Sequence, residues 1–382
     1  MAGEREQGQP APETETYDVV VVGAGAAGLS AAITAAAQGL STVIIEKSPY
    51  WGGSTSRSGG GVWIPNNSVL ERDGVDDTPE RAREYVKAII GEHAREDRID
   101  AYIDRGPEAL EFLMKHAPLD LEWVKGYSDY YPEAPGGRLG GRSVEPRPFD
   151  ARALGDDLDT LHPQYTKAPL NMVVLQSDYR WLNTGMRHWR GPLRMAKVGG
   201  RFFWARSRGE KLIAMGAALA AELLLGVRQA GVPLRLNTGL VDLLTDDGRV
   251  VGVTAESDGR RFDIRAERGV ILACGGFERN AEMRRKYQRE PIGSDWTTGA
   301  PSNTGDGINA SLKIGAAVSL MDDAWWGPTI PLPRGPWFAL SERSVPGTFI
   351  VNMRGERFMN ESLPYVEAVH QMYGGEFGLG DG

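Results

Sequence analysis

The feature that most constrains the fold is a glycine-rich turn between an apolar strand and an alanine-rich helix. Residues 17–22, Tyr-Asp-Val-Val-Val-Val, predict a strand buried on both faces of a parallel sheet. The turn at residues 23–28 reads Gly-Ala-Gly-Ala-Ala-Gly, and residues 29–38 predict a helix. A second apolar strand at residues 41–45 ends at the acidic residue Glu46. Strand, turn, helix, strand and acid in this order predict a Rossmann-like nucleotide-binding unit.

Each glycine of this turn has a specific structural role. Gly23 permits the tight turn, and Gly25 lets the backbone approach a pyrophosphate. Gly28 lets the helix pack closely on the strand. Backbone N–H groups at the start of the helix, around Ala26 and Ala27, and the positive end of the helix dipole are available to the phosphates. The alternative, a glycine-rich turn in an unrelated α/β protein, is disfavoured by the ordered context of the turn.

The residues after the second strand extend the predicted site. Glu46 is placed to accept hydrogen bonds from a ribose, and Lys47 beside it is a further predicted cofactor contact. The loop at residues 51–61 is rich in glycines and hydroxyls, which suit a segment lying against the ribityl chain and flavin ring of a larger ligand. This loop favours FAD over NAD, with a flexible glycine linker as the alternative. The predicted contacts in the loop are Gly52, Gly53, Ser54, Thr55, Ser58, Gly59 and Gly60.

Composition narrows the class of protein. The chain has 382 residues, enough for two domains, and its net charge of −8 argues against nucleic-acid binding. A single cysteine excludes an intrachain disulfide, and five histidines without ligand spacing give no reason to predict a metal. Residues 1–16 predict a disordered leader, and the apolar stretch at 212–227, interrupted by Glu222, predicts a buried helix rather than a membrane span. A cytoplasmic protein is therefore expected.

Three later segments strengthen a resemblance to the fumarate reductase and succinate dehydrogenase flavoprotein superfamily, whose members share this opening and loop. Residues 246–253 predict a hairpin between two strands. Residues 269–277, Gly-Val-Ile-Leu-Ala-Cys-Gly-Gly-Phe, resemble the strand and tight turn that return toward the cofactor. Residues 303–307, Asn-Thr-Gly-Asp-Gly, resemble an element that places its acid near FAD. The cofactor contacts that this resemblance implies are Ala273, Gly275 and Asp306.

Several reactive side chains also have a plainer, structural interpretation. Cys274 is interpreted as a small buried residue rather than a nucleophile. Asp306 has a second role open to it, as the cap of the helix that follows. The paired acids at 76–77, 156–157 and 322–323 are interpreted as solvated loop charges or caps rather than acid/base dyads.

Two further segments resemble the active-site segments of 3-ketosteroid Δ1-dehydrogenases. They are residues 126–132, Gly-Tyr-Ser-Asp-Tyr-Tyr-Pro, and residues 360–365, Asn-Glu-Ser-Leu-Pro-Tyr. The Ala-Trp-Trp at 324–326 resembles the point where that family crosses into its substrate domain. The resemblance implies that Tyr365 removes the C2 proton of a 3-ketosteroid while the flavin takes a hydride from C1, and that Tyr130 helps Tyr365 to lose its own proton. A phenol with a pKa of about 10 needs hydrogen bonds or positive potential to act as a base.

The resemblance also implies the domain organisation. It predicts an α/β chain with a Rossmann-like (GR2-type) FAD-binding domain over residues 17–324, an insertion at about 150–208, and the beginning of an α+β substrate domain over residues 325–382. In that family a later tyrosine and glycine grip the 3-keto oxygen. No matching element is found here, so the chain by itself is expected to be weakly active or inactive. A quinone-like external acceptor is expected to take the electrons.

Other functions stay open at this point. One is a different enzyme of the superfamily, such as a fumarate reductase-like protein or a Δ4-ketosteroid dehydrogenase. Fumarate reduction uses an arginine proton donor and residues that grip a dicarboxylate, and that constellation is not found in the sequence. The other is an FAD-binding chain without activity.

A basic, aromatic segment at residues 180–208 stands out in this acidic protein. It contains eight Arg or Lys residues and no acid, with Trp and Phe residues interleaved. One interpretation is a patch that rests on an anionic membrane, useful when the substrate is a lipid. The other, which we favour, is a surface segment whose aromatic side chains are anchored in the core. Nothing else in the sequence supports nucleic acid as the partner.

Overall fold

The protein is built around a six-stranded sheet. The computed structural model describes residues 15–374 except 166, 167, 334 and 341. In the sheet, β8, β2, β1 and β11 are parallel neighbours, and β10 and β9 continue it antiparallel. The strands, in sheet order, are β8 (Leu234–Arg235), β2 (Thr42–Ile45), β1 (Glu15–Val22), β11 (Arg260–Leu272), β10 (Arg249–Ser257) and β9 (Gly239–Asp246).

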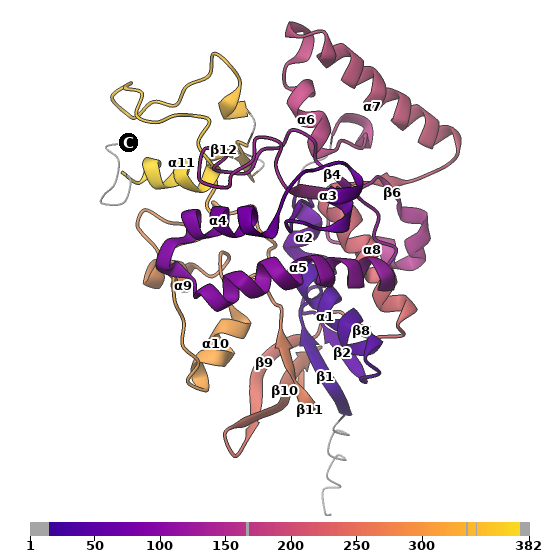
Figure 1. The fold of residues 1–382 in the computed structure, drawn as a ribbon. Coiled ribbons are helices and arrows are strands. Elements are labelled where there is room, and N and C mark those ends of the chain that lie inside the picture. The colour runs from indigo at the N-terminus through magenta and orange to yellow at the C-terminus, as the bar shows by residue number, and fades with distance from the viewer. Residues whose placement is uncertain (1–14, 166–167, 334, 341, 375–382) are drawn as a thin grey trace, which may run out of the picture.

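Helices and short strand pairs surround this sheet (Figure 1). The helices are α1 (Ala26–Ala37), α2 (Gly53–Arg57), α3 (Ser68–Arg72), α4 (Pro79–Ile90), α5 (Glu96–His116), α6 (Gln176–Leu182), α7 (Arg190–Ser207), α8 (Met215–Gln229), α9 (Ala281–Tyr287), α10 (Asp306–Lys313) and α11 (Tyr365–Met372). The short strands are β3 (Val62–Trp63), β5 (Ser143–Pro146) and β4 (Leu121–Trp123) in one sheet, β6 (Phe149–Asp150) with β7 (Leu212–Ile213), and β12 (Thr329–Leu332) with β13 (Gly335–Phe338).

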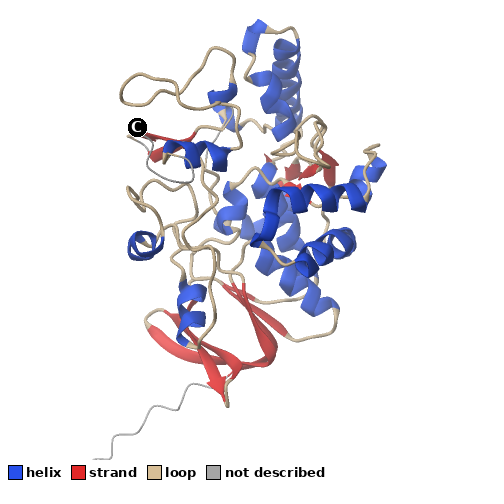
Figure 2. Ribbon diagram, turned by 60° about the vertical axis from the view of Figure 1, so that its left-hand side comes forward, coloured by secondary structure: helices blue, strands red, loops and turns tan. Residues whose placement is uncertain are grey.

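Strand β1 is buried on both faces, as its apolar run predicts. Val21 packs in the same cluster as Leu29 of α1 and Leu223 of α8. Val20, on the opposite face, packs with residues of β10 and β11 such as Ile264, so the antiparallel part of the sheet covers that face. Figure 2 shows these curved strands in red below most of the helices. The α/β fold class is confirmed.

The first strand begins earlier than the sequence indicated. Glu15 and Thr16 are part of β1 and pair with β11, so these two residues do not belong to a leader. An ion pair between Glu15 and Arg235 of β8 fixes this end of the strand. The rest of the predicted leader, residues 1–14, lies outside the described residues.

The two strand elements expected from the flavoprotein resemblance are present. β9 and β10 form the hairpin predicted at 246–253, with Asp247 and Gly248 in the turn at positive φ. β11 runs beside β1 with Leu272 opposite Val22, and the chain then turns at Gly275, whose φ is 72°. The carboxyl ends of β1, β2 and β11 therefore meet at one edge of the sheet, where α1 begins.

Helix α8 is the buried helix predicted for the apolar stretch, and Glu222 lies inside it with 2% of its surface exposed. The Glu222 carboxylate accepts a hydrogen bond from the backbone N–H of Asp120 at 3.3 Å. Burial raises the pKa of Glu222 to about 8, against an ordinary value of 4.5. The folded protein therefore binds a proton at Glu222 that the unfolded chain releases between these two pH values.

We expect Glu222→Gln to stabilise the protein increasingly as the pH rises. Because the folded state holds the extra proton, the stability of the wild type falls with pH between about 4.5 and 8, by up to roughly 1.4 kcal/mol per pH unit, and glutamine avoids this loss. Urea unfolding at pH 5 and pH 8.5 measures the difference, with Glu108→Gln on the exposed side of α5 as control. Equal gains at both pH values would contradict the assignment.

Within the insertion predicted at about 150–208, α6 and α7 form a helical lobe, drawn at the upper right of Figure 1, whereas Ala151 and Leu154 pack in the main core. The two helices are held together by Asp178, which is fully buried. Asp178 pairs with Arg194 at 2.9 Å and with Arg201 at 2.7 Å. Two of the basic residues in the 180–208 segment therefore face inward and neutralise a buried acid.

Three aromatic side chains of this lobe face outward instead. Trp189 is 65% exposed, Phe203 68% and Trp204 62%. The favoured interpretation of the segment, with its aromatic side chains anchored in the core, is wrong for these three residues. The reason is that Asp178 draws the arginine-bearing side of α7 inward, which turns the opposite side of the helix to solvent.

Candidate cofactor and active site

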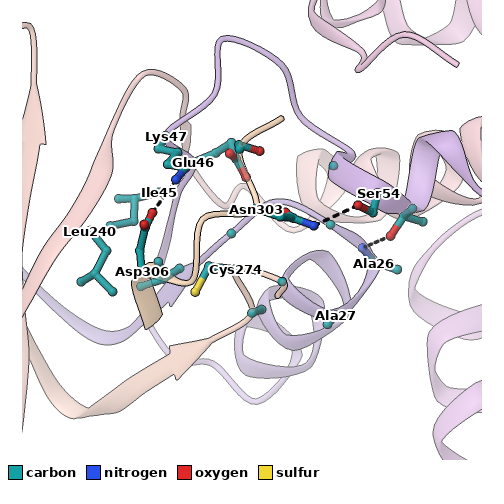
Figure 3. Close-up of a pocket in the computed structure, with 18 of the residues that line it drawn as sticks. Ala26, Ala27, Ile45, Glu46, Lys47, Ser54, Leu240, Cys274, Asn303 and Asp306 are labelled. Atoms are coloured by element: carbon teal, nitrogen blue, oxygen red, sulfur yellow. Dashed lines mark hydrogen bonds and ion pairs between the residues drawn. The ribbon is translucent and has the colours of Figure 1, made fainter. Parts of the chain in front are cut away.

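A cleft lies at the carboxyl ends of β1, β2 and β11, beside the start of α1 (Figure 3). This is the edge where open α/β sheets bind their ligands. Helix α2 and the start of α10 contribute its other walls. The predicted cofactor residues that line the cleft are Gly23, Gly25, Ala26, Ala27, Glu46, Lys47, Gly53, Ser54, Thr55, Ala273, Gly275 and Asp306.

The three fingerprint glycines serve different purposes. A Cβ on Gly23, whose φ is 107°, would lie 2.4 Å from the carbonyl oxygen of Ala273, and one on Gly28 would lie 1.9 Å from that of Gly23. Both are therefore required by the fold itself. A Cβ on Gly25 would meet only Thr55 Oγ1, at an ordinary 3.5 Å. Gly25 thus presents bare backbone to the cleft, which is what close approach of a pyrophosphate needs.

Glu46 closes one side of the cleft with a buried carboxylate. It accepts hydrogen bonds from the backbone N–H of Ala24 and of Ser48, each at 2.9 Å. Burial raises the pKa of Glu46, and these hydrogen bonds and the neighbouring Lys47 oppose that shift. A carboxylate has about four acceptor sites, so those that remain can receive the ribose hydroxyls that the sequence analysis assigned to it.

Lys47, just after the end of β2, and Asp306, at the start of α10, form an ion pair across the cleft, with Lys47 Nζ 2.6 Å from Asp306 Oδ2. Thr304 Oγ1 donates to the other carboxylate oxygen of Asp306 at 2.7 Å. The capping interpretation of Asp306 is wrong: the N-cap of α10 is Gly305, in a left-handed conformation, and the Asp306 side chain turns to Lys47 instead.

Helix α2 is tied to both neighbouring walls of the cleft. Thr55 Oγ1 accepts the backbone N–H of Ala26 at 3.0 Å, so this N–H, expected to be free for phosphate, already has a partner. Ser54 Oγ accepts hydrogen bonds from Ala300 N and from Asn303 Nδ2, both at 3.0 Å. Figure 3 shows the contact of Ala26 with α2 and that of Asn303 with Ser54 as dashed lines. The loop and the helix start are therefore held in a fixed relation before any ligand binds.

Some predicted contacts lie outside the cleft lining. Gly28 is buried against the β1 turn, and Gly52 precedes α2 with a φ of 94°. Ser58, Gly59 and Gly60 pack against the starts of α6 and α8, where Gly59 accepts a hydrogen bond from Gln176 and Ser58 from Gly216. Cofactor contact at these positions stays a prediction, as it does at the lining residues.

Sequence reasoning missed part of the lining. Thr238 directly precedes β9 and Leu240 lies at its start, and Asn303 comes from a segment of which only the acid was predicted to contact the cofactor. Thr238 belongs to no recognisable motif. Its backbone N–H donates to the carbonyl oxygen of Glu46 at 2.8 Å, and this hydrogen bond places it at the cleft. Cys274 lines the cleft and is half-buried; burial raises the pKa of its thiol, which agrees with the non-nucleophilic interpretation.

The two tyrosines assigned from the steroid dehydrogenase resemblance are in contact. Tyr130 Oη and Tyr365 Oη lie 2.5 Å apart although 235 residues separate them in sequence, and their rings meet edge to face at 5.3 Å. Desolvation and the neighbouring phenols of Tyr127 and Tyr365 raise the pKa of Tyr130, so Tyr130 stays protonated. Either hydroxyl can be the donor in this geometry. Tyr365 is the first residue of α11, where the helix dipole favours negative charge. The two side chains are thus in contact, and their chemical roles stay predictions.

The loop that carries Tyr130 is held by a buried charge cluster. Asp129, beside Tyr130, pairs with the fully buried Arg142 and accepts the indole N–H of Trp63 at 2.9 Å. Arg142 Nε also pairs with Asp77 at 2.6 Å, and the Asp77 side chain is only 2% exposed. The interpretation of Asp77 as a solvated loop charge is therefore wrong, because it neutralises a buried guanidinium.

A chain of contacts connects the cleft to the tyrosine pair. The guanidinium of Arg57, in α2, lies over the ring of Tyr165 at 5.6 Å. The Tyr165 hydroxyl accepts the backbone N–H of Phe338 at 3.1 Å. The Phe338 ring packs edge to face against Tyr365 at 5.6 Å. Helix α2, which lines the cleft, is thus connected to the tyrosine pair through a continuous series of contacts.

Among the described residues, no group of three or more His, Cys, Asp or Glu side chains is arranged to hold a metal ion. No helix in the described ranges has both the length and the apolar character needed to cross a bilayer.

Comparison with known proteins places the chain among flavoproteins. The family model described as an FAD binding domain matches residues 18–382. A 3-oxosteroid 1-dehydrogenase of Mycolicibacterium smegmatis is 62% identical over 373 residues, which is 96% of this chain and 66% of that protein. A 3-oxosteroid 1-dehydrogenase of Mycobacterium tuberculosis matches equally, at 62% identity over 374 residues. The chain thus spans 66% of the length of these curated relatives, slightly less than two thirds.

A solved structure agrees with this similarity. The 3-ketosteroid Δ1-dehydrogenase of Sterolibacterium denitrificans, in complex with 1,4-androstadiene-3,17-dione, superposes with a TM-score of 0.87 at 36% identity. The superposition covers 94% of this chain and 67% of that one. Both the sequence and the structural similarity therefore extend over almost the whole of the present chain.

Proposed function

The chain belongs to the FAD-binding domain family, and because it is similar throughout to 3-oxosteroid 1-dehydrogenases, we propose that it dehydrogenates 3-ketosteroids between C1 and C2. The observation that carries this proposal is the hydrogen-bonded pair of Tyr130 and Tyr365. No local signal other than the family resemblance selects these two tyrosines. Their contact supplies a protonated donor next to a phenol at a helix N-terminus, which suits a tyrosine base.

FAD is the cofactor of this family, and the cleft fits it. Gly25 and the start of α1 would hold the pyrophosphate, Glu46 would hold the ribose, and Ser54 and Thr55 of α2 would lie toward the flavin. When bound, FAD supplies a hydride acceptor at N5 and passes the electrons to an external, quinone-like acceptor. The protein's part is to orient the steroid and to move the proton.

In the proposed reaction, Tyr365 Oη takes a proton from C2 of the steroid while a hydride leaves C1, and a C1–C2 double bond forms. Tyr130 donates its O–H to Tyr365 Oη and so stabilises the negative charge on that oxygen before the proton arrives. Because Tyr130 itself resists deprotonation, the pair has one defined base rather than two equivalent ones. The buried Asp129–Arg142 cluster fixes the loop from which Tyr130 projects.

A product assay tests the proposal and separates it from a Δ4-dehydrogenase. The FAD-loaded protein is given 5α-androstane-3,17-dione with a dye acceptor, and the product is identified by mass and NMR. We expect a double bond at C1–C2. A double bond at C4–C5 would indicate the Δ4 reaction, and reduction of fumarate with no steroid product would indicate a fumarate reductase-like enzyme. Bound FAD with no reaction on either substrate would favour a binding chain without activity.

We also propose that the helical insertion rests on an anionic membrane. Trp189, Leu193, Phe203 and Trp204 recur at the spacing of one helical face, and all four are exposed. Lys197 lies on the same side and is also exposed. Apolar side chains that enter the interface, together with cations that meet anionic headgroups, are the requirements of an interfacial helix. Contact of this kind would bring the enzyme to a poorly water-soluble substrate. A cytoplasmic location stays a prediction.

We expect co-sedimentation with vesicles of phosphatidylcholine and phosphatidylglycerol, decreasing at high salt. The double variant Phe203→Ala/Trp204→Ala should bind at least about tenfold more weakly, because it removes two exposed aromatic side chains from the interface. Phe349→Ala, at a side chain that is 67% exposed elsewhere on the protein, is the control. Binding that is unchanged in the double variant, or equally weakened in the control, contradicts this proposal.

A further inference from the structure

Tyr365 has a second hydrogen-bond partner, in addition to Tyr130. The indole Nε1–H of Trp325 donates to Tyr365 Oη at 2.5 Å. An indole nitrogen is a donor only, so the direction of this hydrogen bond is fixed. Tyr365 Oη therefore accepts from Trp325 whichever way the proton is shared with Tyr130.

We propose that Trp325 is a positioning residue for Tyr365, which holds the phenol oxygen in one orientation and stabilises its deprotonated form. The inference rests on the proposed role of Tyr365 as the base. With Trp325 and Tyr130 both donating, two acceptor directions of the deprotonated oxygen are occupied, and one remains to take the proton of the substrate. Hydrogen bonds to a charged acceptor are about twice as strong as those between neutral groups, so the stabilisation is largest in the anionic state.

The turn that carries Trp325 is held against the C-terminal end of α11 by several contacts. Asp323 Oδ1 lies 3.0 Å from Nε2 of His370, in the last turn of that helix, and accepts the indole N–H of Trp326 at 2.5 Å. The Trp326 ring packs against Tyr373, just beyond the end of α11, with ring centroids 6.0 Å apart. These contacts hold the turn at the C-terminal end of the helix, and Trp325 reaches from it to Tyr365 at the N-terminal end.

Packing does not account for the placement of Trp325. Its side chain is 79% exposed, so burial of the indole ring contributes little to the stability of the described structure. The hydrogen bond to Tyr365 is the polar contact that its Nε1–H makes. Substitution at Trp325 should therefore leave the fold intact, which makes the residue suitable for mutagenesis.

The ionisable groups around Tyr365 are few in the described part of the chain. The phenols of Tyr127 and Tyr130 face it from the loop after β4. The buried guanidinium of Arg343 acts on the pKa of Tyr127 and lowers it against the effect of burial. On α11 itself, the Glu367 carboxylate accepts the hydroxyl of Tyr131 at 3.0 Å. None of these groups is altered when Trp325 is replaced, so a change at Tyr365 can be assigned to the indole.

The experiment places 3-fluorotyrosine at position 365 of the full chain and follows its ionisation by 19F NMR as a function of pH. In Trp325→Phe we expect the midpoint of this titration to rise by about one pH unit, because one hydrogen bond to the anion is lost. Trp204→Phe is the matched control, since it also removes an exposed indole, but one on α7 of the helical insertion. Trp325→Leu is a second variant, in case the phenylalanine ring fits poorly.

The outcomes are distinct from those of the steroid assay. A rise in both Trp325 variants and none in Trp204→Phe supports the inference, even in a protein that proves to act on no steroid. An unchanged midpoint in the Trp325 variants overturns it, even in a protein that dehydrogenates steroids. An equal rise in Trp204→Phe also overturns it, because the effect would then not depend on the hydrogen bond between Trp325 and Tyr365.

Discussion

Gly25→Val is expected to yield a folded protein without flavin. A Cβ at Gly25 meets only Thr55 Oγ1, at 3.5 Å, and the backbone there is extended with φ −83°, so the fold accommodates valine at the cost of a weaker helix N-cap. The added methyl groups occupy the space into which a pyrophosphate must come. We expect the affinity for FAD to fall by at least about 100-fold, which is about 2.7 kcal/mol.

The measurement is the ratio of absorbance at 450 nm to that at 280 nm after purification with added FAD, together with the melting temperature with and without FAD. Gly200→Val is the matched control, because Gly200 lies in α7 with nothing within 4 Å of its added Cβ. Gly28→Ala provides the contrast: its Cβ would lie 1.9 Å from a backbone oxygen, so it should lower the melting temperature even without FAD. A Gly25→Val protein with the wild-type flavin content would refute the assignment of the cleft.

Tyr365→Phe is expected to slow reduction of the bound flavin by a 3-ketosteroid by about 10²- to 10⁴-fold, the usual contribution of a positioned general base. Phenylalanine keeps the ring that packs against Tyr130 and Phe338, so the loss should be chemical rather than structural. A single-turnover measurement at 450 nm with 4-androstene-3,17-dione detects it even where turnover is slow.

Tyr373→Phe is the control for this substitution. Tyr373 follows α11 and donates its hydroxyl to the carbonyl oxygen of Pro291 at 2.7 Å, away from the tyrosine pair. Its loss should leave the rate of flavin reduction within about twofold of the wild type, since it makes no contact with the reacting groups. If Tyr365→Phe and the wild type reduce flavin at the same rate, another group is the base and the proposed mechanism fails.

The nucleotide-binding half could be predicted from the sequence because the residues that determine its structure lie close together in the chain. A buried parallel strand needs only its own apolar run, and the tight turn at Gly23 needs only a residue that tolerates positive φ. The acid at the end of the second strand, Glu46, reaches the cleft because consecutive strands of such a unit lie side by side. Residues that come to the cleft from elsewhere, such as Thr238, have no such local signal.

The tyrosine site could be predicted only in part from the sequence. Tyr130 and Tyr365 could be named through a family resemblance, but their contact joins segments 235 residues apart and depends on how the loop after β4 meets α11. Trp325 was noted only as part of a segment between domains, because its hydrogen bond depends on the turn that Asp323 fixes. The hydrogen-bond partners of a side chain such as Tyr365 depend on which distant segments pack together. The spacing of residues in the sequence does not predict this packing.

The sequence by itself determined the Rossmann-like unit, its fingerprint glycines and the basic, aromatic character of the insertion. Tertiary structure alone decided which side of α7 faces water. Asp178, outside the acid-free segment, is buried between the two helices and requires two arginines for charge balance, so Arg194 and Arg201 turn inward and the aromatic face turns outward. The physical reason is that a buried charge must be paired, and its partner is set by packing rather than by sequence distance.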